Sequence, residues 1–226
     1  MFAFQASISD ILFKMLIVNE IFFSLQGESS HAGKPCVFIR LTYCNLRCSY
    51  CDTTYAFQEG TEMSIDDIMI EIGRYDCRLV EITGGEPLLQ TDVHELMKRL
   101  CDTNYEVLLE TSGSLDIGSV DHRVKRIMDI KCPSSGMESK NMWDNIQYLK
   151  SGDELKFVIG SRKDYEWSKS VIQKYELSRR CPIIMLVVFK ELESSELVRW
   201  ILDDKLDVRF QLQTQKYIWK PETRGV

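Results

Sequence analysis

Short apolar runs alternate with segments of helical periodicity along this chain of 226 residues, and no other feature limits its possible folds as much. Seven apolar runs have the length and the polar boundaries of strands: residues 36–43, 79–83, 106–110, 126–130, 154–159, 181–189 and 207–212. Five segments have helical spacing: residues 65–75, 92–102, 141–149, 164–175 and 194–203. The alternation predicts an α/β fold with a largely parallel sheet and helices outside it.

The number of these units decides between a closed and an open sheet. Fewer than eight strand–helix units can be counted, so we expect a partial, trimmed TIM-like β/α barrel or an open curved sheet rather than a full barrel. In either architecture, loops at the carboxyl ends of the strands carry the site. Ser64 and Thr91 are the expected N-caps of the first two helices, and Ser64 with Asp67 resembles a capping box.

Charge and composition argue against several classes of partner. The net charge is −6 and acidic and basic residues are mixed, which disfavours nucleic-acid binding and favours a small-molecule substrate. No apolar run approaches the roughly 20 residues that span a membrane, and residues 1–14 lack the basic start of a secretory signal. We therefore expect a cytoplasmic protein with no membrane partner. Residues 1–14 would be an N-terminal extension and residues 15–226 one domain.

Three of the eight cysteines crowd into one short segment. Cys44, Cys48 and Cys51 follow the first expected strand with the spacing C-x3-C-x2-C. A cubane iron–sulfur cluster normally takes four thiolates, so three on one loop would leave one iron open to a reactant. A zinc site with a distant fourth ligand, or three unrelated thiols, would fit the same spacing. The spacing by itself leaves these alternatives open.

A glycine-rich turn, one strand–helix unit further along, favours the cluster. The apolar run 79–83 continues directly into the sequence Gly-Gly-Glu-Pro at residues 84–87. Two glycines at a strand end let another group approach the backbone and leave amides free, and the carboxylate of Glu86 could anchor a cation. A tight turn would explain these four residues alone, but it does not explain the turn and the cysteine triplet together.

The triplet, the aromatic residue before its last cysteine and the Gly-Gly-Glu-Pro turn resemble the radical S-adenosylmethionine superfamily. In that superfamily, the open iron of a four-iron, four-sulfur (4Fe–4S) cluster chelates S-adenosylmethionine, and reductive cleavage yields a 5′-deoxyadenosyl radical. The resemblance implies that Cys44, Cys48 and Cys51 hold the cluster, with segments 110–113 and 131–135 beside the cofactor's ribose and sulfonium. The residues that it implies for S-adenosylmethionine are Tyr50, Cys51, Asp52, Gly85, Cys132, Pro133 and Ser134.

The flanks of the triplet narrow the resemblance to one family. Residues 22–28 read FFSLQGE, residues 52–55 read DTTY, and residues 211–219 read QLQTQKYIW. From about residue 15 to the C-terminus, the pattern resembles the 7-carboxy-7-deazaguanine synthase family. Its members are lyases that convert 6-carboxy-5,6,7,8-tetrahydropterin into 7-carboxy-7-deazaguanine with loss of ammonia, for queuosine and archaeosine biosynthesis. The resemblance further implies a homodimer, magnesium and an external electron donor of the flavodoxin or ferredoxin type.

The same resemblance implies the substrate contacts. Arg40 lies four residues before the triplet, where its planar guanidinium could bind a carboxylate, and its apolar neighbours make a solvent-exposed arginine the poorer explanation. Magnesium fills much of its shell with substrate oxygens and waters, and the resemblance makes Thr53 its protein ligand. The residues implied for substrate binding are Leu25, Gln26, Gly27, Glu28, Arg40, Thr83 and Gln215. No acid–base catalyst is assigned, since the radical performs the chemistry.

Two departures from the family pattern concern the C-terminal segment. Relatives often have histidine where this chain has Gln215, and some end near the position of Pro221, whereas this chain continues to Val226. Both departures put the C-terminal substrate contacts in doubt and leave the radical core unaffected. Among enzymes, the main alternative is a glycyl-radical enzyme activase. Outside enzymes, it is an interaction module with a structural zinc site.

Overall fold

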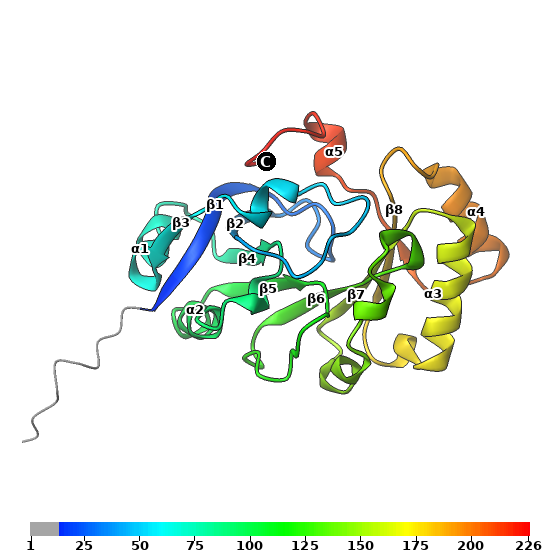
Figure 1. Ribbon diagram of the computed structural model, residues 1–226, viewed down its shortest axis with the longest axis horizontal. Coiled ribbons are helices and arrows are strands. Elements are labelled where there is room, and N and C mark those ends of the chain that lie inside the picture. Colours follow the sequence, from blue (N-terminus) through cyan, green and yellow to red (C-terminus); the bar gives the residue numbers. More distant parts are fainter. Residues whose placement is uncertain (1–13) are drawn as a thin grey trace, which may run out of the picture.

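One curved sheet forms the centre of the molecule (Figure 1). The computed structural model describes residues 14–226, so the expected extension of residues 1–14 lies, except for Lys14, outside the described residues. The strands are Met15–Leu25 (β1), Pro35–Leu41 (β2), Thr61–Ser64 (β3), Leu79–Gly84 (β4), Glu106–Thr111 (β5), Lys125–Ile130 (β6), Glu154–Ile159 (β7), Ile183–Val187 (β8) and Arg209–Phe210 (β9). Their order across the sheet is β3-β1-β2-β4-β5-β6-β7-β8-β9.

Seven strands, β2 and β4 to β9, run parallel, and they correspond to the seven predicted strand runs. The sheet remains open, so the expected α/β fold with a partial barrel is confirmed, and the cysteine loop follows the first parallel strand. At one edge, β1 and β3 are added antiparallel and were not predicted. A register shift between Val18 and Glu20 interrupts the alternation of β1, which weakens its strand signal in the sequence.

Helices cover the outer face of the sheet (Figure 1). They are Ile65–Ile72 (α1), Val93–Asp102 (α2), Arg162–Lys174 (α3) and Ser194–Asp203 (α4), whereas the short helix Gln215–Ile218 (α5) lies near the C-terminus and lines the cavity with Gln215 and Lys216. The predicted cap of α1 is confirmed, because the Ser64 hydroxyl accepts from Asp67 N at 3.1 Å. The predicted cap at Thr91 is wrong. Asp92 is the N-cap residue of α2, and its carboxylate accepts from Met15 N at 3.2 Å instead of capping the helix.

The predicted helix over residues 141–149 is also wrong. The segment contains a 3-10 helix, Trp143–Tyr148, instead of an α-helix. Asn145 is completely buried there, and its side-chain amide donates to Gly113 O at 3.1 Å and to Leu115 O at 2.8 Å. Its Oδ1 accepts from Ile117 N at 3.1 Å. These long-range bonds fix the segment against the preceding loop, so tertiary contacts override its helical periodicity.

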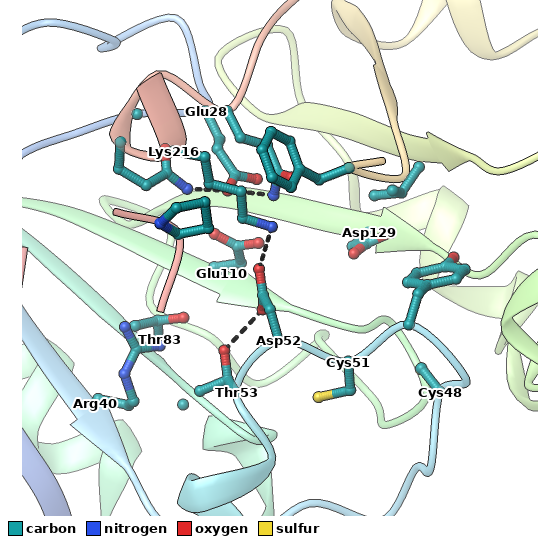
Figure 2. Close-up of a pocket in the computed structure, with 18 of the residues that line it drawn as sticks. Glu28, Arg40, Cys48, Cys51, Asp52, Thr53, Thr83, Glu110, Asp129 and Lys216 are labelled. Carbon is teal, nitrogen blue, oxygen red and sulfur yellow. Dashed lines mark hydrogen bonds and ion pairs between the residues drawn. The ribbon is translucent and has the colours of Figure 1, made fainter. Parts of the chain in front are cut away.

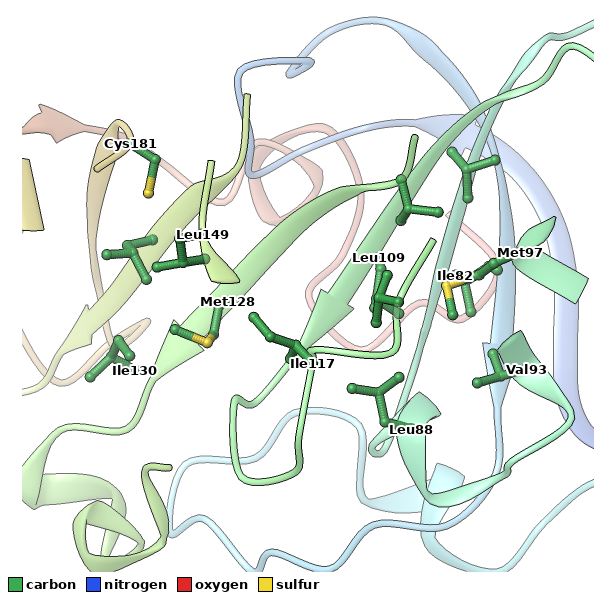
Figure 3. Close-up of a cluster of buried hydrophobic side chains, with 14 of the residues drawn as sticks. Ile82, Leu88, Val93, Met97, Leu109, Ile117, Met128, Ile130, Leu149 and Cys181 are labelled. Carbon is green, nitrogen blue, oxygen red and sulfur yellow. The ribbon is translucent and has the colours of Figure 1, made fainter. Parts of the chain in front are cut away.

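The larger apolar core lies between the sheet and the outer helices. Alternate residues of a strand point to opposite faces, so every second residue of the parallel strands enters this core. Val80 and Ile82 of β4 do so, and Leu109 of β5 packs in the same layer. Figure 3 shows Ile82 and Leu109 beside Val93 and Met97 of α2. Burial of these side chains stabilises the fold by roughly 1.5–3 kcal/mol each.

A second, smaller cluster occupies the inner side of the curved sheet, and its members come from the beginnings of the parallel strands and from β1: Phe22, Cys36, Phe38, Leu79, Leu108 and Ile127. Further along the same strands the inward-facing residues become polar, as at Thr83 and Glu110. Because all these strands run in one direction, the apolar residues fill one end of the inner space. The polar residues gather at the carboxyl ends, where the chain builds its cavity.

A membrane-spanning segment would need a long apolar helix, and residues 14–226 contain none.

Candidate active site

A cavity of about 710 Å³ opens at the carboxyl ends of the parallel strands. It is within the size range of ligand sites. Among the site residues predicted from the sequence, nearly all line it: Leu25, Gln26, Gly27, Glu28, Arg40, Cys44, Cys48, Tyr50, Cys51, Asp52, Thr53, Thr83, Gly85 and Gln215. The predicted residues outside the cavity wall are Cys132, Pro133 and Ser134.

The cysteine loop leaves β2 and forms one wall of this cavity. Its three cysteines are free thiols and half-buried. Burial raises the pKa of each thiol, while the nearby ammonium of Lys131 acts in the opposite direction on all three. Bound metal would remove the thiol protons outright. A cation beside three prospective thiolates suits a negatively charged cluster.

Two glycines bring the second motif against the cysteine loop. A Cβ atom at Gly84 would lie 2.3 Å from Leu41 O, and one at Gly85 would lie 2.2 Å from Tyr43 O and 2.6 Å from Cys44 Cβ. Real Cβ atoms do not approach so closely, so both positions require glycine. Gly85 N donates to Leu41 O at 3.2 Å, and Glu86 N donates to Tyr43 O at 2.8 Å. The close approach that the glycines suggested is therefore made by the cysteine loop itself.

The structure corrects the suggestion that Glu86 anchors a cation. Glu86 is completely buried, and its carboxylate accepts from Leu88 N, from the hydroxyls of Thr111 and Ser112, and from Ser112 N. These bonds connect the end of β4 to the end of β5. Glu86 thus fixes the backbone beside the cysteine loop, and its carboxylate is occupied by protein donors.

The segment after β6 is hydrogen-bonded to the cysteine loop. The Cys132 side chain is completely buried in the outer core, so it does not reach the cavity. Ser134 O accepts from the Ser49 hydroxyl at 2.6 Å, and Ser135 O accepts from Ser49 N at 3.0 Å. Ser134 N donates to Asp164 at 2.9 Å. The Cys132 thiol therefore does not reach the cavity, and the role of residues 132–134 in cofactor binding stays a prediction.

Gln26 organises the turn that carries the other half of the site. Its Nε2 donates to Glu81 Oε2 at 3.0 Å, and its Oε1 accepts from Glu28 N at 2.9 Å and from Ser29 N at 3.0 Å. Only 2% of Gln26 is exposed. Since both polar atoms of the amide have protein partners, Gln26 acts on a ligand mainly by shaping the turn around Gly27 and Glu28.

Glu28 projects from that turn into the cavity (Figure 2). Its Oε1 accepts from Gln213 Nε2 at 2.9 Å and from Gln215 Nε2 at 2.6 Å, and its Oε2 pairs with Lys156 Nζ at 3.1 Å. A Cβ at Gly27 would lie 2.0 Å from Gln215 Oε1, so the glycine leaves room for the C-terminal segment. Segments far apart in the sequence thus meet on one carboxylate.

Arg40 reaches the cavity from β2. Its Nε donates to Glu20 Oε1 at 2.8 Å, and its guanidinium lies 5.6 Å from the Phe22 ring centroid and 5.9 Å from that of Tyr55. Burial would lower the pKa of Arg40, but the Tyr55 and Glu20 oxygens raise it, so the charge is held firmly. Nε is paired, while the two terminal nitrogens make no hydrogen bond to any residue of 14–226. This geometry suits a fork that binds a carboxylate.

Asp52 and Thr53 lie between Arg40 and the cysteines in Figure 2. Asp52 Oδ1 accepts from the Thr53 hydroxyl at 2.9 Å, and Asp52 Oδ2 pairs with Lys216 Nζ at 2.6 Å. Burial would raise the pKa of Asp52, but Lys216 lowers it, so the carboxylate is charged. The sequence pointed to Thr53 and Asp52, whereas Lys216 was not among the predicted site residues.

Several charged residues inside the barrel were also missed by sequence reasoning. Glu81 of β4, Asp129 of β6 and Lys156 of β7 all line the cavity, although each belongs to a strand with apolar neighbours. Burial, followed by the nearby Glu110, raises the pKa of Glu81 to about 8. A charged residue that interrupts an otherwise apolar parallel strand was the available signal, since such a residue must face a lined interior.

Comparisons with known proteins agree with this geometry. Residues 38–201 match the family model of the Radical SAM superfamily. A 7-carboxy-7-deazaguanine synthase from Chlorobaculum tepidum is 49% identical over 214 residues, which cover 93% of this chain and 97% of that protein. Another, from Koribacter versatilis, is 43% identical and covers 92% of this chain and 99% of its own length. The chain belongs to the 7-carboxy-7-deazaguanine synthase family.

Two solved structures share the fold of this chain. The crystal structure of QueE from Escherichia coli superposes with a TM-score of 0.73 at 22% identity, covering 88% of this chain and 96% of that one. Streptococcus suis SuiB, bound to S-adenosylmethionine, gives a TM-score of 0.54 at 15% identity over 76% of this chain and 45% of that one. Membership of the synthase family does not favour a glycyl-radical activase or a structural zinc module.

A radical S-adenosylmethionine enzyme requires a 4Fe–4S cluster and S-adenosylmethionine, and the cysteine loop fits this requirement. Its three thiols line the cavity and are free of disulfides. Within residues 14–226, no three His, Cys, Asp or Glu side chains converge as ligands of a single metal ion would. A cubane cluster does not need that convergence, because each thiolate binds a different iron atom. Lys131 adds a positive charge beside the thiols.

Proposed function

We propose that this family member converts 6-carboxy-5,6,7,8-tetrahydropterin into 7-carboxy-7-deazaguanine with loss of ammonia, as part of 7-deazapurine biosynthesis for queuosine or archaeosine. The observation that carries this proposal is one cavity lined both by the cysteine loop and by Glu28 and Arg40. A carboxylate and a guanidinium on the wall of one cavity suit a substrate that has an amino-substituted ring and a carboxylate.

In the radical half of the site, Cys44, Cys48 and Cys51 hold the 4Fe–4S cluster. With S-adenosylmethionine, the cluster supplies the 5′-deoxyadenosyl radical that starts the reaction. The proposed contacts of S-adenosylmethionine are Tyr50, Cys51, Asp52, Gly85, and the backbone of Cys132 and Pro133 with Ser134. The close approach of Gly85 to Tyr43 and Cys44 supports this assignment, because it would hold Gly85 next to the ligands of the cluster.

In the substrate half, Glu28 accepts hydrogen bonds from the amino-bearing edge of the pterin, and Arg40 binds its carboxylate. Thr83 donates its hydroxyl from the end of β4, and Leu25, Gln26 and Gly27 shape the backbone beside the ring. Gln215 acts through Glu28. The support for these roles is that every one of these residues lines the cavity, with Glu28 and Arg40 already charged.

Magnesium belongs to the same proposal, with Thr53 as its protein ligand. The Thr53 hydroxyl lies at the junction of the two halves and next to the charged Asp52. Magnesium retains waters and binds substrate oxygens, so one hydroxyl with a neighbouring carboxylate can suffice. There the ion would offset negative charge on the substrate carboxylate.

The wider setting follows from the family. We propose that residues 15–226 form one domain, that two copies assemble as a homodimer, and that a flavodoxin- or ferredoxin-type protein supplies the electron. A cytoplasmic location is supported by the cysteines, since their thiols must stay reduced to hold the cluster.

The proposal can be tested by genetic complementation. A bacterial strain that lacks its own 7-carboxy-7-deazaguanine synthase would express this chain, and queuosine in its transfer RNA would be measured by mass spectrometry. We expect queuosine to return with the parent chain and to be absent with Cys48→Ala, because two thiolates do not secure a cubane with an open iron. A well-expressed parent chain that restores no queuosine, or a Cys48→Ala variant that restores it fully, would contradict the proposal.

A further inference from the structure

Lys156 has no role in the function described so far, yet it occupies the middle of the barrel interior. It belongs to β7, and its neighbours Leu155 and Phe157 enter the outer core, so strand alternation turns Lys156 inward. Only 3% of its side chain is exposed. Its ammonium pairs with Glu110 and lies 3.1 Å from Glu28 Oε2. A lysine buried this deeply needs such partners.

The contacts of Glu28 divide between its two oxygens. Oε1 accepts from the amides of Gln213 and Gln215, which are neutral donors on the C-terminal segment. Oε2 pairs with Lys156, which brings the full positive charge. The amides can hold the carboxyl group in place whether or not it is charged, while Lys156 favours its charged form.

The pKa of Glu28 also depends more on Lys156 than on the amides of Gln213 and Gln215. Burial alone raises the pKa of Glu28, and the charge of Asp52 raises it further. Lys156 is the first of the groups that lower it, followed by Gln213 and Gln215, and the net direction is downward. The other charged or titratable groups near Glu28 and Lys156 on the cavity wall include Glu81, Glu110, Lys216, and the pair of Asp129 with Lys131, which lie 2.8 Å apart.

These neighbours do not replace Lys156. Glu81 has a pKa of about 8, so it is largely neutral near pH 7, and Glu110 is an anion that shares Lys156. Lys216 is occupied by Asp52 at 2.6 Å. Glu28 and Glu110 therefore face the ammonium of Lys156, with the pKa of Lys156 raised well above its usual value by the two carboxylates against the effect of burial. Lys156 is thus a permanent charge and not a proton carrier.

We propose that Lys156 is a positioning residue that keeps the Glu28 carboxylate charged and oriented, so that the site selects a heterocycle whose edge presents an N–H donor. Three donors already bind this carboxylate, and of its roughly four acceptor sites one remains for a ligand N–H, whereas a protonated carboxyl group would itself donate. This inference rests on the proposed function, because the pterin supplies that donor edge. Lys156 itself would not touch the substrate.

The test is equilibrium binding of 6-carboxy-5,6,7,8-tetrahydropterin, measured anaerobically by calorimetry without S-adenosylmethionine or reductant. Lys156→Met removes the charge and keeps a long side chain, while Lys156→Arg keeps the charge. Near neutral pH we expect Lys156→Met to weaken binding by about tenfold or more, the size of one lost charge-assisted contact. Lys156→Arg should recover most of the affinity.

The pH profile distinguishes positioning from a general loss of structure. In the parent chain the lowered pKa keeps Glu28 charged from about pH 5.5 upward, and Glu81 stays largely neutral up to about pH 7, so binding should be flat between about pH 5.5 and 7. Without Lys156, burial raises the pKa of Glu28, and binding in Lys156→Met should improve as the pH rises through that raised value. A structural defect would not create this slope. Flat and unweakened binding in Lys156→Met would overturn the inference.

Lys156→Met could be unstable, because the buried carboxylates of Glu28 and Glu110 lose their cation. The same substitution is therefore also tested in a variant that lacks the Glu28 carboxylate. Glu28→Gln removes it, so Lys156→Met can be compared within Glu28→Gln. If Lys156 acts through Glu28, it should add no further loss of binding there, and a further tenfold loss would overturn the inference. If the parent chain binds no pterin, the proposed function fails first. Parent binding with an insensitive Lys156→Met rejects only the role of Lys156.

Discussion

At the scale of single residues, Gln215 departs from the histidine expected from the family pattern. Its Nε2 donates to Glu28 Oε1 at 2.6 Å, beside the donor of Gln213. A neutral histidine could donate the same bond, but histidine also titrates near neutral pH, which glutamine does not. The contact with Glu28 therefore indicates that this position orients the carboxylate and transfers no proton.

This interpretation predicts opposite outcomes for two substitutions. Gln215→His should change turnover little, while Gln215→Ala should raise the KM for the pterin by up to about tenfold, because Glu28 loses one of its donors. Gln213→Ala should act in the same direction, since Gln213 binds the same oxygen. The measurement is a pH–rate profile under anaerobic turnover. A histidine variant that is about 10²-fold faster and gains a titration near neutral pH would instead make this position a general acid or base.

At the scale of elements, the predicted helix cap at Ser64 is confirmed and the one at Thr91 is wrong, and this difference can be measured. Ser64 accepts from Asp67 N, whereas the hydroxyl of Thr91 precedes a helix whose N-cap residue is Asp92. We expect Ser64→Ala to lower the free energy of unfolding by about 1 kcal/mol. Thr91→Ala is the matched control and should lower it by less than about 0.5 kcal/mol. Chemical denaturation of both variants checks this, and equal losses would contradict the assignment.

Local sequence patterns predicted the parallel part of the sheet well, for a physical reason. A parallel strand with buried residues on both faces reads as a continuous apolar run, as in Ile183–Val187. The antiparallel strands β1 and β3 and the segment 141–149 were not predicted correctly. Their conformations depend on pairing across the sheet and on the buried Asn145, which are long-range contacts that no local pattern contains.

At the scale of the whole molecule, the candidate site was predictable where a motif fixes it and unpredictable where topology does. The cysteine triplet and the Gly-Gly-Glu-Pro turn carry their own spacing, and the structure places both on one cavity. Lys156 and Asp129 carry no motif. They enter the site only because strand alternation points them inward and because neighbouring strands share a register. The register between strands cannot be predicted from the local sequence, because it depends on how the whole sheet is assembled.

The position of the C-terminal residues after Pro221 could also not be predicted from local sequence patterns. Residues 220–224 and Val226 line the cavity, and Figure 1 shows the chain ending close to β1 and β2. Arg224 pairs with Glu59 at 2.8 Å and stacks 3.7 Å from the Tyr55 ring centroid. Tyr55 in turn lies beside Arg40. The tail is therefore attached to the mouth of the cavity next to the residue proposed for the substrate carboxylate.

In the proposed enzyme, one open barrel joins a radical cluster to a pterin site. The most direct test is the mass of the product formed when the cluster-loaded chain is incubated anaerobically with 6-carboxy-5,6,7,8-tetrahydropterin, S-adenosylmethionine, reductant and magnesium. We predict 7-carboxy-7-deazaguanine together with released ammonia, and slower formation when magnesium is withheld. Cleavage of S-adenosylmethionine to 5′-deoxyadenosine with the pterin recovered unchanged would contradict the proposed function.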